Sequence, residues 1–244
     1  MTQIISLFVS LFILISCSSE RPQGKTAAEV LYKEAQVNVE NKRYILANEK
    51  LNMLKNRYPY SYYATPAELM QAEILFKQEK FAEAAAAFIV FRDFHPKHPK
   101  SSYVLLMIAE SFFNQVPDTF DRDLQPAEDA IKYYREMLAT YPNSPHRPKA
   151  LENMLKCKEM LRSKEKYIAD FYYKTEVYDA ARWRYLEILN EFQNPSLKNH
   201  SMKRIILSSY HMGEKQDCLR YYQKYAPFIG KDEKVEDTLE ECRK

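Results

Sequence analysis

Glycine is nearly missing from this chain. Its 244 residues contain three glycines, Gly24, Gly213 and Gly230, where an average usage of about 7% would give about seventeen. Tight β-hairpin turns need glycine, whereas helix interiors exclude it. The residues beyond position 17 also show no clean alternation of apolar and polar side chains, so no strand is expected. The sequence therefore predicts an all-α fold.

Cysteine is also scarce, and neither sign of charge dominates. Beyond Cys17 the chain has Cys157, Cys218 and Cys242, an odd number at spacings that suit neither a zinc site nor a disulfide framework. One bridge is conceivable in an oxidising compartment, but we expect three unpaired thiols. The formal net charge is +3, from 36 basic and 33 acidic residues. This balance is too mixed to predict nucleic-acid binding.

Long apolar runs are absent except near the start, where residues 4–16 are almost wholly apolar and Cys17 follows. A helix of that length rises about 20 Å, too little for a hydrocarbon core of about 30 Å. The run therefore has the size of a signal-peptide core. The motif Leu14-Ile15-Ser16-Cys17 resembles the lipobox of bacterial lipoproteins, which implies cleavage before Cys17 and acylation of that cysteine. An ordinary secretory leader is the alternative.

Internal repetition is the strongest signal in the remaining sequence. Four segments place an alanine three residues after a small or aromatic residue, with large apolar residues four and seven positions further on. In the first, second and fourth copies a second alanine lies twelve residues earlier. In the third copy it lies 21 residues earlier. Twelve residues accommodate the end of one helix, a tight turn and the start of an antiparallel partner, so that two alanines meet where the helices cross. The pairs are Ala35 and Ala47, Ala72 and Ala84, Ala109 and Ala130, and Ala169 and Ala181.

This pattern resembles the tetratricopeptide repeat and predicts a right-handed superhelical solenoid of about five tetratricopeptide-like helix pairs. A fifth, degenerate pair has Cys218 in the alanine position. Residues 114–123 read as a protruding loop inserted in the third pair. Residues 147–176, which contain no glycine and no proline after Pro148, read as one long helix. Residues 231–244 are expected to form a polar capping helix. A helical bundle without repeats is the alternative.

No catalytic or metal-binding motif stands out. His95 and His98 lie three apart but are flanked by prolines, and no third ligand is near them in the sequence. The chain has no glycine-rich phosphate loop, no G-x-S-x-G and no H-E-x-x-H. We expect no metal, no cofactor and no enzymatic activity.

A binding groove is the functional hypothesis that the repeats favour. In tetratricopeptide proteins the first helix of each pair lines a concave groove, at positions three before, one after and four after its small residue. A groove of apolar, acidic and aromatic side chains suits an extended client peptide. The alternative is that these side chains form core. The positions are Tyr32, Gln36, Val39, Leu69, Glu73, Phe76, Leu106, Glu110 and Phe113.

Two phrases narrow the resemblance further. RDLQPAEDAIKYYREMLATYPNSPHRPKA (122–150) and YIADFYYKTEVYDAARWRYLEILNEF (167–192), together with the lipobox and the repeats, resemble the BamD-type family, the lipoprotein subunit of the outer-membrane β-barrel assembly machine. The resemblance implies a periplasmic scaffold held at the outer membrane by its lipid. A lipoprotein adaptor for pilus assembly or peptidoglycan remodelling is the alternative function.

The resemblance also implies a division of labour along the chain. After a signal peptide (1–16) and a lipidated tether (17–25), the N-terminal repeats (26–120) would engage unfolded β-barrel clients. The C-terminal repeats (121–230) would dock a barrel-forming partner that has periplasmic repeats, with other subunits of the machine nearby. The position that matches the family's docking arginine is Arg184, and Trp183 and Tyr178 lie in the same phrase. The alternative for Arg184 is an exposed residue that pairs with Glu187.

Overall fold

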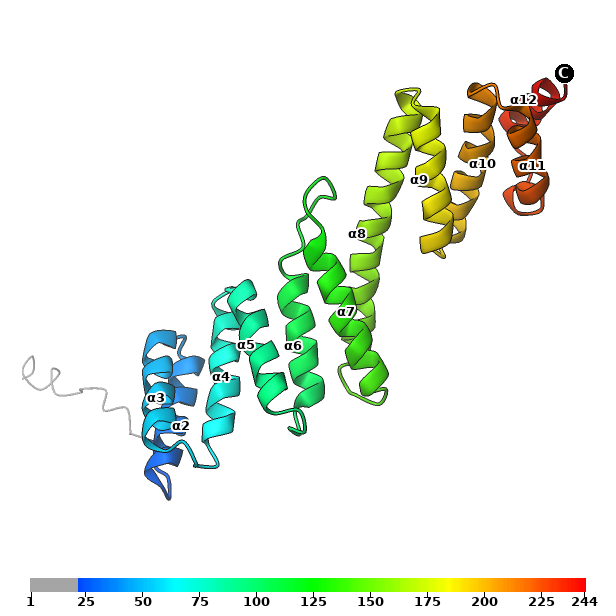
Figure 1. Cartoon of the computed structure of the whole chain (residues 1–244). Coiled ribbons are helices and arrows are strands. Elements are labelled where there is room, and N and C mark those ends of the chain that lie inside the picture. Colours follow the sequence, from blue (N-terminus) through cyan, green and yellow to red (C-terminus); the bar gives the residue numbers. More distant parts are fainter. Residues whose placement is uncertain (1–21) are drawn as a thin grey trace, which may run out of the picture. The chain divides into compact units, whose positions relative to one another are not determined.

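The structure consists of helices and the turns between them. The computed structural model describes residues 22–244, so the apolar run and Cys17 lie outside the described residues. No strand occurs in the described part of the chain, and none of its helices is both long and apolar enough to cross a membrane. Figure 1 shows the helices in chain order: α2 (Ala27–Glu40), α3 (Tyr44–Arg57), α4 (Ala64–Lys77), α5 (Phe81–Phe94), α6 (Ser101–Phe113), α7 (Gln125–Thr140), α8 (Arg147–Lys174), α9 (Tyr178–Glu191), α10 (Pro195–His211), α11 (Lys215–Ile229) and α12 (Glu233–Arg243).

The chain divides into two compact units, one ending at Ala87 and the other beginning at Phe88, within α5. The first unit holds α2, α3, α4 and the start of α5. The second holds the end of α5 and all later helices. The client and partner halves expected to meet at residue 120 concern function rather than compactness, and they stay a prediction.

Small buried side chains mark every helix pair, as expected. All eight alanines of the four aligned pairs are at most 1% exposed, and Cys218 of α11 is fully buried in the equivalent position. Larger side chains surround them, including Leu51, Phe88, Tyr134 and Tyr185, which are also fully buried. A side chain no larger than a methyl or thiol group lets two helices pack closely. The predicted all-α, tetratricopeptide-like pairing is confirmed.

The turn inside four of the five pairs has one geometry. In each of these turns, one residue just after the first helix has a positive φ. These residues are Lys42 (57°), Glu79 (60°), Glu176 (63°) and Gly213 (75°). The amide of the next residue donates to a carbonyl five positions earlier, as in Arg43 to Asn38 and Val177 to Tyr172. These features define the Schellman helix ending, whose left-handed position glycine usually fills. The repeated turn explains the constant twelve-residue spacing, and it is made three times without glycine.

Two predicted irregularities are present. The long helix is α8, which at 28 residues is twice the length of α9, and its two halves pack on α7 and on α9. The inserted segment forms a loop between α6 and α7, but it does not simply protrude. Phe120 packs on the Tyr167 ring of α8 at 5.2 Å between centroids, and Lys164 Nζ donates to the Arg122 carbonyl at 3.4 Å.

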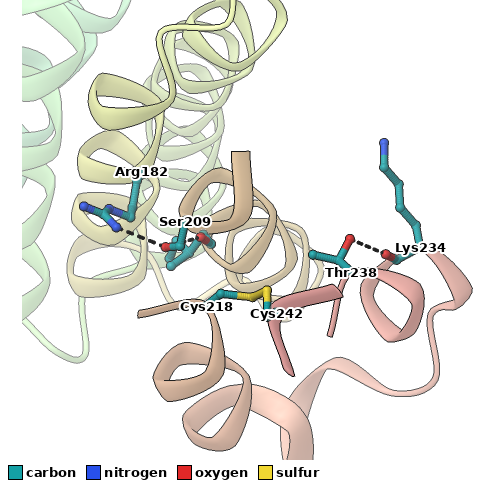
Figure 2. Close-up of a disulfide and its surroundings, with 7 residues drawn as sticks. Arg182, Ser209, Cys218, Lys234, Thr238 and Cys242 are labelled. Carbon is teal, nitrogen blue, oxygen red and sulfur yellow. Dashed lines mark hydrogen bonds between the residues drawn. A yellow bond between two sulfur atoms is a disulfide. The ribbon is translucent and has the colours of Figure 1, made fainter. Parts of the chain in front are cut away.

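The expectation of three unpaired thiols is wrong for two of them. Cys218 of α11 and Cys242 of α12 form a disulfide with their Cα atoms 6.5 Å apart (Figure 2). The bridge forms because α12, the expected capping helix, packs against α10 and α11 with its Cys242 face buried. Cys157 stays a free, buried thiol, and burial, with the Glu110 carboxylate nearby, raises its pKa to about 11.

Ala84→Leu tests whether the helix crossing depends on a small residue. Ala84 of α5 is fully buried, so we expect the added volume to lower the free energy of unfolding by about 1–3 kcal/mol. Ala86→Leu, in the same helix at an exposed position, should change it by less than about 0.5 kcal/mol. Urea denaturation of both variants provides the measurement. Equal stability of the two variants would contradict the crossing argument.

Candidate client and partner surfaces

Three of the nine expected groove residues do not face a groove. Leu69, Leu106 and Glu110 are 3%, 5% and 4% exposed, so the expectation that they line an open surface is wrong. Sequence periodicity predicts the side of its own helix on which a residue lies. It does not predict which later helix covers that side. Leu69 is one of the buried apolar side chains of α4. In the second unit, α6 is covered by both α7 and α8.

Glu110 is the centre of a buried polar network that joins three helices. The Tyr134 hydroxyl of α7 donates to Glu110 Oε1 at 2.6 Å, and Asn153 Nδ2 of α8 donates to the same oxygen at 2.8 Å. Lys149 of α8 forms an ion pair with Oε2 at 2.8 Å. Burial and the adjacent Glu110 carboxylate raise the pKa of Tyr134 far above its usual range, so the phenol remains a donor. Glu110 therefore holds the fold together.

The other expected groove residues keep some exposure. In the first unit Gln36 is exposed and Tyr32, Val39, Glu73 and Phe76 are partly exposed; in the second unit Phe113 is partly exposed. Burial, together with the nearby Glu73 carboxylate, raises the pKa of Tyr32, and buried side chains of α2 and α4 belong to one core cluster. These six residues remain a prediction for client binding.

A tyrosine-rich turn beside this surface was not anticipated. The segment RYPYSYY (57–63) joins α3 to α4, with Tyr60 fully exposed and Tyr62 84% exposed. Tyr63 packs its ring on Tyr32 at 5.4 Å and meets Tyr62 edge-on at 5.5 Å. Four tyrosines within six residues are the sequence signal that could have revealed it. Exposed, clustered aromatic rings are typical of protein-binding surfaces.

The three expected docking residues lie on different sides of α9, because successive residues turn by about 100° around a helix. Trp183 is 55% exposed and points away from the core. Arg184 turns toward α8, where it pairs with Glu165 at 3.4 Å and not with Glu187, the partner named by the alternative. Tyr178 turns toward α10 and stacks on His211 at 4.5 Å between centroids. Trp183 and Arg184 still touch, with the guanidinium carbon 5.0 Å from the indole ring.

Arg182, two residues before Arg184, makes contacts within the fold. Its guanidinium donates to Ser209 Oγ of α10 at 3.1 Å (Figure 2) and forms ion pairs with Glu214 and Asp217 at the start of α11. Arg182 therefore connects α9 to both helices of the next pair, α10 and α11. Arg184 has a single, partly exposed ion pair, whose contribution is about 0–1 kcal/mol, so its guanidinium can be redirected to a partner at little loss of stability.

A cleft of about 840 Å³ opens beside the middle of α8. It exists because α8 extends beyond both neighbours, so the stretch between its two packed halves is left uncovered. Leu155, 60% exposed, lies in this cleft. Ile131, Leu161 and Phe192 also line it, and charged side chains of both signs surround them.

Nowhere in residues 22–244, this cleft included, do three or more His, Cys, Asp or Glu side chains form a cluster that could hold a metal ion.

The fold and these surfaces define a tetratricopeptide-type helical-repeat protein whose exposed features suit binding to other proteins. The family model YfiO, described as outer membrane lipoprotein, matches residues 25–224. The chain therefore belongs to this outer membrane lipoprotein family.

Named relatives span most of the chain. The outer membrane protein assembly factor BamD of Neisseria meningitidis serogroup A is 29% identical over 229 residues, covering 87% of this chain and 86% of the relative. BamD of Neisseria gonorrhoeae is 30% identical over 215 residues, covering 81% and 80%. BamD of Vibrio cholerae is 29% identical over 218 residues, covering 85% and 90%.

Two solved structures give weaker matches. The TPR2AB domain of yeast Sti1, in its complex with pHSP90, has a TM-score of 0.46 at 9% identity, covering 90% of this chain and 84% of that one. The TPR domain of P58(IPK) has a TM-score of 0.44 at 12% identity, covering 88% and 64%.

Glu110→Ala distinguishes a structural from a client-binding role for this carboxylate. Its removal leaves the Tyr134 hydroxyl and the Asn153 amide buried without an acceptor, so the free energy of unfolding should fall by about 2–4 kcal/mol. Glu128→Ala, which removes an exposed carboxylate on α7, should have little effect. Urea denaturation compares the two. Unchanged stability of Glu110→Ala would return Glu110 to the list of groove candidates.

Proposed function

We propose that this protein is the scaffold lipoprotein of a machinery that assembles β-barrel proteins into the outer membrane. The observation that carries the proposal is the family match over residues 25–224, combined with relatives of nearly the same length that are named outer membrane protein assembly factor BamD. The helical repeats supply a rigid framework, and the exposed aromatic and arginine side chains supply contacts. The role is binding and positioning rather than catalysis.

Cys17 is the proposed point of attachment to the membrane. The family description as outer membrane lipoprotein supports it, as does the lipobox-like LISC at residues 14–17. Acyl chains contribute about 0.8 kcal/mol per buried methylene, and stable attachment requires two or more anchoring signals. An acylated Cys17 would leave the helical repeats outside the bilayer, which agrees with the absence of a membrane-spanning helix in the described chain.

Cys17→Ala should release the protein from the outer membrane. When cells that produce the variant are fractionated, we expect the protein in the soluble or inner-membrane fraction instead of the outer-membrane fraction. Mass spectrometry of the N-terminal peptide of the unaltered protein should show an acylated Cys17. Cys157→Ala is the control, because Cys157 is a buried thiol of α8. An unaltered fractionation of Cys17→Ala would contradict the anchor.

The first unit is the proposed contact for unfolded β-barrel clients. Its support is the exposed aromatic surface formed by Tyr32, Tyr60, Tyr62 and Tyr63, with Glu73 close to Tyr32. Transmembrane β-strands alternate lipid-facing apolar and lumen-facing polar residues. Aromatic rings with polar edges can contact both kinds of side chain in an extended segment.

The second unit is the proposed dock for the barrel-forming partner, through Arg184 and Trp183. A guanidinium beside an exposed indole is a combination enriched at the energetic centres of protein interfaces. Glu165 holds Arg184 in place without burying it. Tyr178, which is stacked on His211, supports α9 from its other side and is proposed to position the helix rather than to contact the partner.

Arg184→Glu tests this assignment and the function together. The tagged protein, purified from its native membranes in mild detergent, should recover a large outer-membrane barrel protein with periplasmic repeats. Loss of an interface hot spot of about 2 kcal/mol should reduce this recovery more than tenfold in Arg184→Glu, while thermal unfolding stays close to that of the unaltered protein.

Arg57→Glu provides the matched control, because Arg57 is an exposed arginine of the first unit and its replacement makes the same change of charge. Full recovery of the barrel protein by both variants would overturn the docking role of Arg184 but not the proposed function. Recovery of pilus or cell-wall proteins in place of the barrel protein would overturn the proposed function.

A further inference from the structure

A second hollow in the second unit, of about 370 Å³, lies along α10 between the end of α8 and the start of α12. One stripe of α10 forms most of its wall, since the contributing residues are three, four or seven apart. Buried Leu207 contributes an apolar part of the lining. The lining residues are Ser196, Asn199, His200, Lys203, Arg204, Leu207, Asp232 and Lys234.

The polar groups of this hollow are held in place by neighbouring helices. His200 Nε2 contacts Asp170 Oδ1 of α8 at 2.7 Å, and Asp170 also accepts from Tyr185 of α9 at 2.5 Å. Burial opposes ionisation of Asp170, but the hydrogen bonds from His200, Lys166 and Tyr185 prevail and keep its pKa well below the usual range. Asn199 Nδ2 donates to the carbonyl of Phe228 at 3.3 Å. The lining is therefore organised in advance of any ligand.

Cations outnumber anions here, and two of them lack a carboxylate partner. Lys203 pairs with Asp232 at 2.6 Å, and Asp232 also caps α12 by accepting from the Val235 amide. The Arg204 guanidinium lies 4.1 Å above the Tyr173 ring, which fixes its plane without neutralising its charge. Lys234 is exposed on the first turn of α12, and its side chain extends away from the disulfide (Figure 2). Neither Arg204 nor Lys234 forms an ion pair within residues 22–244.

An exposed apolar residue is joined to the lining of this hollow through Asn199. The backbone carbonyl of Phe228, at the end of α11, accepts from Asn199, and Phe228 is 67% exposed. A chain that presents carboxylates to Arg204 and Lys234 and continues past Asn199 would approach Phe228. A planar guanidinium matches a carboxylate through two parallel hydrogen bonds.

We propose that this hollow binds an acidic peptide segment of a protein partner, with carboxylates on Arg204 and Lys234 and an apolar side chain further along the segment, past Asn199, on Phe228. Recognition of an anionic bilayer surface uses clusters of about four to eight basic residues. Two uncommitted cations in a hollow instead match a pair of carboxylates on one chain. The inference deepens the proposed function, because it assigns a partner chemistry to the second unit at a place separate from Arg184.

A direct binding measurement tests the proposal without any assembly partner. The probe is a fluorescent eight-residue peptide that contains four glutamates and two leucines, and the protein is the full chain in detergent. Fluorescence anisotropy should show saturable binding that weakens as salt is raised, since exposed charges are screened. The double variant Arg204→Gln/Lys234→Gln should bind about tenfold more weakly, as the loss of two charge-assisted hydrogen bonds implies.

Four comparisons make the result decisive. The control variant Arg57→Gln/Lys77→Gln removes one exposed arginine and one exposed lysine of the first unit and should bind like the unaltered protein. The glutamine version of the peptide should bind weakly. Far-ultraviolet circular dichroism and thermal unfolding check that loss of the Arg204 stacking has not unfolded the second unit, and Lys234→Gln alone, at an exposed site, should still weaken binding.

Other outcomes overturn the proposal. These are an absence of peptide binding up to about 1 mM, or equal affinities for the double variant and the control. A third is binding to vesicles with anionic phospholipid that depends on Arg204 and Lys234 when peptide binding does not, which would make the hollow a lipid site. The recovery of the barrel partner is measured separately, so failure of this site and failure of the proposed function are distinguishable.

Discussion

Close approach of two helices at a small, buried side chain is the contact on which the rest of this structure depends. At Ala35 and Ala47, and at the alanines of the next three aligned pairs, neither helix presents more than a methyl group to the other. The larger neighbours can then pack around the crossing, and the second helix of each pair presents a continuous apolar face to the next pair. In the fifth pair Cys218 takes this position. A thiol fits there as alanine does, and it additionally allows a covalent link to α12.

The long helix α8 packs in two successive layers of helices and thereby leaves an exposed cleft. Its first half completes the packing of α6 and α7 through Asn153 and Lys149, which meet Glu110. Its second half carries Ala169 and begins the next pair with α9. The stretch between the halves cannot be covered by helices of ordinary length, so Leu155 remains exposed in a cleft. The inserted loop that reaches α8 at Tyr167 covers part of its outer face near the second half.

What the sequence predicts and what it misses follow from the range of the interactions involved. The alanine pairs, the turns and the 28-residue helix depend on residues close together in the chain, and their patterns are visible as spacing. The Cys218–Cys242 bridge, the Glu110 network and the pairing of Arg184 with Glu165 depend on which helix covers which. Spacing along one helix gives a direction for a side chain but not its neighbour. For this reason helix spacing predicts a surface location for Leu69, Leu106 and Glu110, whereas the structure shows that they are buried.

The distribution of arginine shows how one helical framework separates stability from recognition. Arg182 is enclosed by Ser209, Glu214 and Asp217, so its charge is fully used in joining successive pairs. Arg184 has one partly exposed partner, and Arg204 has an aromatic ring in place of a carboxylate. A stacked guanidinium retains its charge and its donors while its orientation is fixed. Side chains of that kind can bind an incoming carboxylate without first losing an internal ion pair. Arg204 therefore keeps a charge that no carboxylate of the described residues pairs with, and Arg184 has only one partly exposed ion pair, whereas the charge of Arg182 is already used within the fold.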